Sequence, residues 1–370
     1  MTEPVSTTAP PPVPPALPAP ARRRWPVVVS VLAVLVFVLA VAGAVIRLPY
    51  VIYSPGDATP VQHVIRIKGA RIYEHPGQVL FLTVSVSSEQ PNVWRWLAAT
   101  VDDDSDVIGE HDYLRGQSRA RVEKENVAAM NESQLFAKKV ALEQLGYQVT
   151  ATGSGAKVEQ VLRGAPADGK LHRGDVITAI DGKPVRVRDE VGEIVRARPA
   201  GTAFDLTVTR AGRTRRVALT TAEAPDGELR GKPYLGVGAV TKDLQVEFPV
   251  DVRIDPGPVS GPSAGLAFTL TIVDELSPGD LTGGRKVAVT GTIDPNGGVG
   301  EVGGVRQKTA AAIDAGAKLF LVPRAEVREA RQRAGNHLEV VGVDTIADAL
   351  RALREHGGAP VQKVAPSRAA

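Results

Sequence analysis

The sequence predicts an α+β protein that begins with one transmembrane helix and continues as three further folded regions. Three observations support this fold class. An apolar run near the N-terminus is long enough to cross a membrane, alternating apolar and polar stretches predict strands, and other segments repeat apolar residues at helical spacing. The chain has 370 residues, which is room for two or three domains.

The composition of the chain argues against several kinds of partner. Lys and Arg together number 44 and Asp and Glu 41. No long basic tract lies in the C-terminal half, so we expect no nucleic-acid binding. The chain has no cysteine, which excludes disulfides, CxxC zinc sites and thiol nucleophiles. Its six histidines include no HExxH pair, so we expect no bound metal.

The N-terminal segment predicts a membrane anchor. Residues 1–24 begin with a Pro- and Ala-rich stretch, and we expect them to form a disordered cytoplasmic tail. Residues 25–46 carry no charge, and a helix of about 20 such residues crosses a bilayer. The arginines gather before this run, at 22–24, and only Arg47 follows it closely, so everything after residue 48 is expected outside the cytoplasm. A cleaved signal peptide is the alternative, with "AVAGA" as its processing site, but the long run favours an uncleaved anchor.

Residues 47–149 predict a β-rich membrane-proximal region. The stretches "VQHVIRIKGARIY" and "GQVLFLTVSVSS" read as strands bounded by Gly, Pro or Ser. The acidic run "DDDSD" at 102–106 is expected to be a solvated loop. Apolar residues at helical spacing predict a helix over 132–145, with Gly146 as its C-cap.

Residues 150–222 alternate strands and turns around one helix near 189–197. The stretch "AKVEQVLRGAPADGKLHRGDVITAIDGKPV" resembles a PDZ domain, and the resemblance implies peptide capture by strand addition between a sheet edge and the helix. A loop of the Gly-Leu-Gly-Phe type is not evident, since "LGYQV" at 145–149 is a poor substitute, so the resemblance leaves specificity for a peptide C-terminus open. The positions that carry the resemblance are Ala165, Pro166, Ala167, Leu171, Gly174, Asp175, Ile177, Ile180, Gly182 and Val185.

A polar linker, 222–232, precedes a last domain at 233–352, where one serine raises a question. In "GPSAG", Ser263 lies where small residues open into an apolar helix, and a helix cap is the more common role of a serine in that position. The same letters fit the G-x-S-x-G elbow of the α/β-hydrolases. That elbow follows a strand directly, whereas "DPGPVSGP" separates Ser263 from the strand "LQVEFPVDVRI".

A lysine is the other base available to this serine. Lys308 lies one turn into a helix predicted from about Val305 to Ala315, and taken alone a solvated lysine is the simpler interpretation. A Walker loop would need glycine at the positions of Gln307 and Val302, so we expect no nucleotide site.

Together, "GPSAG" and "GGVRQK" resemble the two signatures of the Lon proteolytic domain, and "VTGTID" and "AGAKLFLVP" extend the likeness. With the anchor and the PDZ domain, the chain resembles the membrane-bound PDZ–Lon proteases of bacteria, the YlbL type. The resemblance implies that Ser263 is the nucleophile, Lys308 the general base and Thr290 the residue that steadies the lysine. Two positions depart from the family: Ser260 replaces a frequent acidic residue, and Thr292 replaces the usual Glu.

A Ser-Lys dyad requires a lysine with a lowered pKa and backbone amides that form an oxyanion hole. A lysine with a pKa near 10.4 must lose about three pKa units to act as a base at neutral pH, a cost of about 4 kcal/mol. Burial and a position near the start of a helix both act in that direction. The serine turn is expected to supply the oxyanion hole from the backbone of Gly261, Pro262, Ser263 and Ala264.

The prediction is therefore an ATP-independent, membrane-anchored serine endopeptidase without a cofactor, which cuts polypeptides outside the cytoplasm. The PDZ domain would bind or gate these substrates, and the resemblance to Lon implies a homo-oligomer. Residues 353–370 are expected to form a C-terminal tail. The alternative is a non-catalytic, membrane-anchored PDZ adaptor or chaperone with a degenerate Lon domain. An enzyme of the signal-peptidase type also pairs Ser with Lys, but its serine follows the membrane helix closely.

Overall fold

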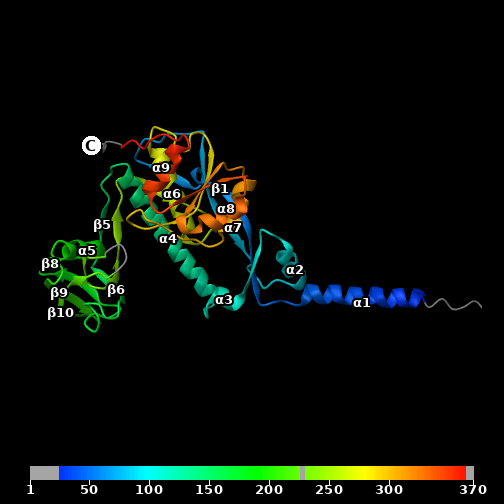
Figure 1. Ribbon diagram of the computed structural model, residues 1–370, viewed down its shortest axis with the longest axis horizontal. Helices are drawn as coiled ribbons and strands as arrows, with labels where there is room; N and C mark the ends of the chain where they lie inside the picture. The colour runs from blue at the N-terminus through cyan, green and yellow to red at the C-terminus, as the bar shows by residue number, and fades with distance from the viewer. Residues whose placement is uncertain (1–24, 226–229, 364–370) are drawn as a thin grey trace, which may run out of the picture.

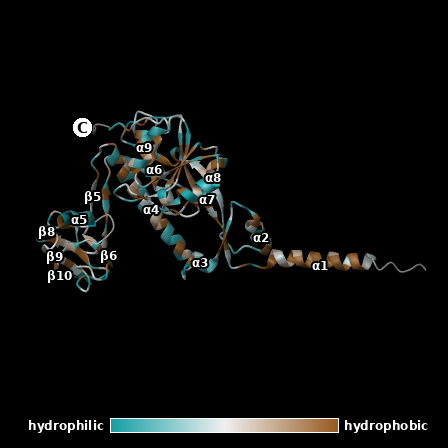
Figure 2. Ribbon diagram, viewed as in Figure 1, coloured by the Kyte–Doolittle hydropathy of each residue, from teal (hydrophilic) through white to brown (hydrophobic). Residues whose placement is uncertain are grey.

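The computed structural model describes residues 25–225 and 230–363. The predicted tail at 1–24 and the last part of the predicted tail at 353–370 lie outside these residues. Helix α1 (Trp25–Val45) projects from the body as a single rod (Figure 1) and is apolar along its length (Figure 2). It is long and apolar enough to cross a membrane. The structure confirms a mixed helix-and-strand fold with one apolar N-terminal helix.

The body of the protein is built on one six-stranded sheet with the order β20-β19-β16-β3-β1-β4. Strand β16 pairs in parallel with both β3 and β19, whereas β1 is antiparallel to β3 and β4. The strands are β1 (Tyr50–Pro60), β3 (Gln78–Val86), β4 (Asp106–Gly109), β16 (Lys286–Val289), β19 (Leu319–Pro323) and β20 (Glu339–Val343). The predicted division between a membrane-proximal region and the last domain is therefore wrong, because strands from both complete the same sheet.

Helices cover both faces of this sheet because β3 is apolar on both. Its residues Val79 and Phe81 face one core together with α6, whereas Leu80 and Leu82 face a second core together with α7 and α8. The helices of these layers are α4 (Arg119–Gln144), α6 (Gly265–Leu276), α7 (Val305–Asp314), α8 (Val327–Ala334) and α9 (Ile346–Glu355). Helix α6 is buried almost all round, as expected for a helix without a polar face.

Helix α4 begins well before the predicted helix at 132–145. Ser118 caps its first turn by accepting a hydrogen bond from the amide of Arg121, which is a favourable N-cap. Its end is as predicted, since Gly146 adopts a φ of +89° just after the last turn. The remaining short elements of the body are η1 (Val61–His63), β2 (Ile65–Lys68), α2 (Val93–Val101), α3 (Glu110–Leu114), β15 (Asp251–Ile254), η2 (Pro262–Ala264), β17 (Thr292–Ile293), β18 (Val299–Gly300) and η3 (Arg324–Glu326).

The acidic run at 102–106 is a docking segment and not the solvated loop that the sequence predicts. Asp104 forms an ion pair with Arg333 of α8. The carbonyl oxygen of Asp103 accepts hydrogen bonds from Arg306 of α7. Asp106 accepts a further bond from Gln307 at 2.7 Å. The run therefore ties the segment between α2 and β4 to the helix that carries Lys308.

A second lobe holds a six-stranded sheet, with the order β10-β9-β7-β6-β13 and with β8 paired to β7 (Figure 1). Strand β13 lies within the predicted last domain (233–352), but it hydrogen-bonds antiparallel to β6 and completes this second sheet. Two short ladders, β11 with β12 and β5 with β14, lie at its boundaries. The elements are β5 (Thr150–Thr152), β6 (Ala156–Val161), β7 (Val176–Ile180), β8 (Lys183–Pro184), α5 (Arg188–Arg196), β9 (Ala203–Arg210), β10 (Arg213–Thr220), β11 (Ala222–Glu223), β12 (Pro233–Tyr234), β13 (Val237–Thr241) and β14 (Gln245–Glu247).

Candidate active site

Ser263 lies inside the short 3-10 turn η2, directly before the buried helix α6. The N-cap positions of the two elements are Gly261 and Ala264, and no side chain caps either of them. The capping role, which is the more common one for such a serine, is therefore not the role of Ser263. Its side chain is half-buried and lines a cavity.

Neighbouring segments hold the serine turn in place from two sides. The carbonyl oxygen of Ser263 accepts a hydrogen bond from the amide of Gly291 at 2.9 Å and from the hydroxyl of Thr290 at 3.3 Å. On the other side, helix α4 supplies the hydroxyl of Ser133, which donates to the carbonyl of Pro262 at 3.0 Å. These contacts fix the backbone of the turn at the edge of the cavity that Ser263 lines.

Lys308 is the fourth residue of α7 and is only 3% exposed. Burial lowers its pKa to about 8, because the charged amine loses its hydration. The helix start reinforces this direction, since the positive end of the helix dipole disfavours a cation. Gly304, in the left-handed conformation just before α7, contacts β3 so closely that a Cβ there would lie 2.6 Å from Val84. The start of α7 is thus pressed against the sheet, which keeps the lysine away from bulk water.

Glu326 opposes the effect of burial on Lys308. Its negative charge raises the pKa of the lysine, and the lysine in turn lowers the pKa of the Glu326 carboxyl, which burial raises. The amide of Val302 donates to Oε1 of Glu326 at 2.8 Å, while its buried Oε2 has no hydrogen-bond partner within the described part of the chain. Glu326 was not among the predicted site residues, because only the fold brings η3 next to α7.

A cavity of about 750 Å³ contains both candidate residues. It lies between strand β3, the segment before α6 and the Gly-rich segment before α7. Ser263 and Lys308 both line it, although no hydrogen bond joins their side chains among the described residues. Ser260 and Thr292, the two positions that depart from the Lon pattern, line the same cavity.

Two predicted details of the site need correction. The amide of Gly261 donates to the carbonyl of Asn126 at 3.1 Å, and Pro262 has no N–H to donate. Of the four residues predicted to form the oxyanion hole, Gly261 and Pro262 therefore offer no free amide for that role, and Ala264 lies within the hydrogen-bonded turn η2. The hydroxyl of Thr290, predicted to steady Lys308, donates to the backbone of Ser263 instead.

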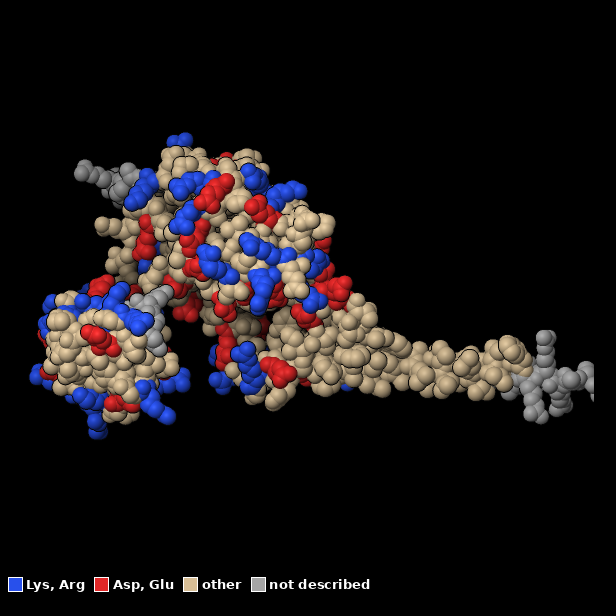
Figure 3. Space-filling model, viewed as in Figure 1, with Lys and Arg blue, Asp and Glu red and all other residues tan. Residues whose placement is uncertain are grey.

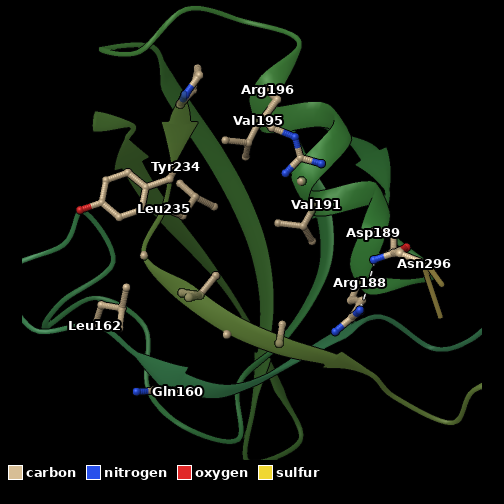
Figure 4. Close-up of a pocket in the computed structure, with 16 residues that line it drawn as sticks. Gln160, Leu162, Arg188, Asp189, Val191, Val195, Arg196, Tyr234, Leu235 and Asn296 are labelled. Carbon is tan, nitrogen blue, oxygen red and sulfur yellow. Dashed lines mark ion pairs between the residues drawn. The ribbon is translucent and has the colours of Figure 1, made fainter. Parts of the chain in front are cut away.

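A second cavity, of about 570 Å³, lies between helix α5 and strand β13 of the second lobe. Val191 and Val195 of α5 face Leu235 across it (Figure 4). Strand β13 is the last strand of its sheet, so its outer edge has no partner strand in that sheet. Asn296, from the body, lines the same groove.

The tight turn that leads into β13 was missed in the sequence. It has the letters "YLGV", Tyr234–Val237, and Gly236 adopts a φ of +76° there. A Cβ on Gly236 would lie 2.1 Å from the Cβ of Ala165, so only glycine fits. The turn follows the last expected strand of the domain, whereas "LGYQV", the segment compared with a peptide-binding loop, precedes the first.

Two known families match parts of the chain. Residues 144–221 match the PDZ domain family, and residues 240–355 match the Lon protease (S16) C-terminal proteolytic domain. The chain combines a PDZ domain with a Lon proteolytic domain.

Lon proteases of other bacteria are similar to part of this chain. A Lon protease of Phenylobacterium zucineum is 35% identical over 118 residues, which are 30% of this chain and 15% of the relative. A Lon protease of Desulfatibacillum aliphaticivorans is 31% identical over 140 residues, 36% of this chain and 16% of the relative. The PDZ–Lon chain thus spans only a small part of the length of these relatives. The crystal structure of the PDZ domain of an SdrC-like protein from Listeria innocua is 26% identical, covers 23% of this chain and 92% of that one, and has a TM-score of 0.21.

Proposed function

We propose that this chain is a serine endopeptidase, with Ser263 as nucleophile and Lys308 as general base. One observation carries the proposal. A lysine with its pKa lowered to about 8 and a serine whose hydroxyl caps no helix line the same cavity. A neutral amine is able to accept the serine proton, and a cationic lysine is not. Relatives that share the Lon domain bear the name Lon protease, which supports the same reaction class.

The reaction proceeds by acyl transfer. Lys308 accepts the Ser263 proton as the oxygen attacks a peptide carbonyl, and the amide of Ser263 stabilises the oxyanion. The resulting ammonium donates its proton to the leaving amine, so the acyl-enzyme forms with a neutral Lys308. A water molecule then transfers a proton to Lys308 while its oxygen attacks the ester. Collapse of this second intermediate returns the proton to Ser263 and releases the carboxylic acid. No step needs a nucleotide or a metal.

The PDZ groove is proposed to bind polypeptide substrates. An extended peptide would add to the free edge of β13, and its apolar side chains would lie against Val191 and Val195 of α5. The turn Tyr234–Val237 is the segment that we propose to hold a peptide C-terminus. Whether bound peptide delivers substrate or gates the cavity, the contact of Asn296 with the groove brings the Lon domain next to it.

Helix α1 is proposed to anchor the chain in a membrane, with the N-terminus cytoplasmic and both domains outside. The support is its length, its lack of charge and the arginines that precede it. The absence of native cysteine makes a direct test simple. In a Val240→Cys variant, whose residue is 40% exposed in β13, a membrane-impermeant maleimide should label intact cells. Labelling only after permeabilisation would reverse the topology.

The protease proposal is tested with the purified full chain in detergent micelles and fluorescent casein. Ser263→Ala removes the nucleophile, and Lys308→Arg replaces the base by a side chain that does not give up its proton. Each variant should lower the rate by roughly 1,000-fold or more. Ser260→Ala, a serine in the same cavity, is the matched control and should retain most activity. Equal rates for the wild type and Ser263→Ala would leave the non-catalytic PDZ adaptor as the better interpretation. The homo-oligomer stays a prediction from the resemblance.

A further inference from the structure

Helix α2 presents an apolar face that stays exposed in the described part of the chain, apart from the contact of Trp94 with α1. Trp94 and Leu97 are each 46% exposed and Val101 is 77% exposed, with Ala98 exposed between them. These residues are three, four and seven positions apart, so they share one side of the helix. On the opposite side, Ala99 is buried. Large apolar residues gathered on one exposed helix face mark an interaction surface.

The same face is fixed against the end of α1. The indole Nε1 of Trp94 donates a hydrogen bond to the carbonyl of Ala40 at 2.9 Å. The Trp94 ring lies directly on Gly43, where a Cβ would come within 2.7 Å of it. Because Ala40 precedes the last residue of α1 by about one and a half turns, Trp94 lies roughly 8 Å inside the end of the helix, measured along its axis.

The surroundings of α2 match the boundary of a bilayer. Figure 3 shows the uncharged surface of α1 continuing onto the adjoining part of the body, where Figure 1 places α2. Arg95 and Thr100 flank the apolar face and are exposed. Tryptophan is enriched at membrane–water interfaces, and a helix with one apolar face and polar flanks lies in the plane of that interface.

We propose that α2 is an interfacial helix that lies in the outer leaflet, with Trp94, Leu97 and Val101 at the boundary between headgroups and acyl chains. This inference rests on the proposed membrane anchor and goes beyond it, since a single-span anchor does not require a second lipid contact. The occupant of the apolar face is lipid, because the face is continuous with α1 and meets it inside the end of the span.

The contact would set the height of the catalytic cavity above the membrane. Helix α2 leads directly into the acidic run, whose Asp103, Asp104 and Asp106 bind α7 and α8. Helix α7 carries Lys308. Two attachments, α1 and α2, would then hold the body in one orientation relative to the bilayer, which a single flexible anchor does not do.

Site-directed spin labelling tests the proposal in the full chain. Single-cysteine variants Leu97→Cys and Val101→Cys are labelled with a nitroxide and reconstituted in phosphatidylcholine–phosphatidylglycerol vesicles. Val34→Cys in α1 is the lipid reference, and Val240→Cys in the PDZ domain is the aqueous reference. Collision of the nitroxide with oxygen reports lipid, and collision with a water-soluble nickel chelate reports water. We expect the nickel collision rate at Leu97 and Val101 to be several-fold lower than at Val240, with oxygen collision raised.

The two references separate this proposal from the anchor. Water-like values at 97 and 101 together with a lipid-like value at 34 would overturn the interfacial helix and leave the anchor intact. A water-like value at 34 would overturn both. Arg95→Cys, on the flank of the helix, should give an intermediate value. Equal values at 95, 97 and 101 would contradict an oriented helix, because the apolar face would then not be distinguished from its flank.

Discussion

The hydroxyl of Thr290 donates a hydrogen bond to the carbonyl oxygen of Ser263 at 3.3 Å. Thr290 is fully buried, and its neighbour Gly291 donates to the same oxygen at 2.9 Å. Two donors from one segment thus fix the peptide group of the proposed nucleophile. Thr290 therefore contacts the serine backbone, and replacing it should affect the serine and not the pKa of Lys308.

Thr290→Val should lower kcat about fivefold and leave the pH midpoint of the reaction unchanged. The substitution removes one neutral hydrogen bond, worth about 1 kcal/mol, while Gly291 still satisfies the carbonyl. The pH–rate profiles of the wild type, Thr290→Val and Thr290→Ser provide the measurement, and the serine variant should recover most of the rate. A shifted midpoint in Thr290→Val would instead assign the residue to Lys308.

Activity should rise with pH through about 8. Only the neutral Lys308 accepts a proton, and burial lowers its pKa to about 8, so the active fraction increases as this group loses its proton. The measurement is kcat/KM of the full chain against pH, since this parameter reports the free enzyme. A rate that is constant from pH 6 to 9 would argue against a lysine base with that pKa.

Lys308→Met should be inactive and, at neutral pH, more stable than the wild type. The lysine pKa is about 8 in the folded chain and near its ordinary value of 10.5 when the chain is unfolded. Below pH 8 both states bind the proton, and the folded state then carries the full cost of the buried charge, at most ~3 kcal/mol. Between pH 8 and 10.5 the unfolded state binds more protons, so wild-type stability recovers and the difference shrinks. Thermal unfolding at pH 7 and pH 10 measures this, with Lys318→Met, an exposed lysine, as control.

The sequence predicts local features of this protein well and its long-range contacts poorly. Three helices, α1, α5 and α7, end within two residues of their predicted ends. The spacing of apolar residues that predicts a helix involves only residues close together in the sequence. The hydrogen bond from Ser133 to Pro262 joins residues 129 positions apart. The sequence around each residue has no feature that predicts this bond. The resemblance to Lon predicts the roles of Ser263 and Lys308. The contact of α4 with the serine turn is seen only in the fold.

Glu326 shows the same limit in the electrostatics of the site. No carboxylate is evident near Lys308 in the sequence, but η3 brings Glu326 close enough to raise the lysine pKa. Its local sequence, "PRAEV", has no feature that predicts such a role. A carboxylate that opposes burial keeps the lysine more basic, and therefore a stronger proton acceptor once it is neutral.

Glu326→Gln should move the pH midpoint of activity below about 8. The amide keeps an oxygen for the N–H of Val302 and removes the negative charge that raises the pKa of Lys308. A larger share of the lysine is then neutral at pH 7. The readout is the pH–rate profile, and Glu355→Gln, an exposed carboxylate at the end of α9, is the matched control. An unchanged midpoint would mean that the charge of Glu326 does not reach the lysine.

Gly192→Leu should block the PDZ groove without harming the fold. Gly192 lies in α5 and lines the groove, and a Cβ there would meet only the flexible end of the Arg196 side chain. Leucine is also the better helix former, by up to about 1 kcal/mol. Binding of a fluorescent peptide with an apolar C-terminus should weaken at least roughly tenfold, a loss of about 1.4 kcal/mol. Glu193→Leu adds the same side chain to an exposed position of α5 that does not line the groove and should bind as the wild type does. If Gly192→Leu binds the peptide as tightly as Glu193→Leu, the peptide does not occupy the space between α5 and β13.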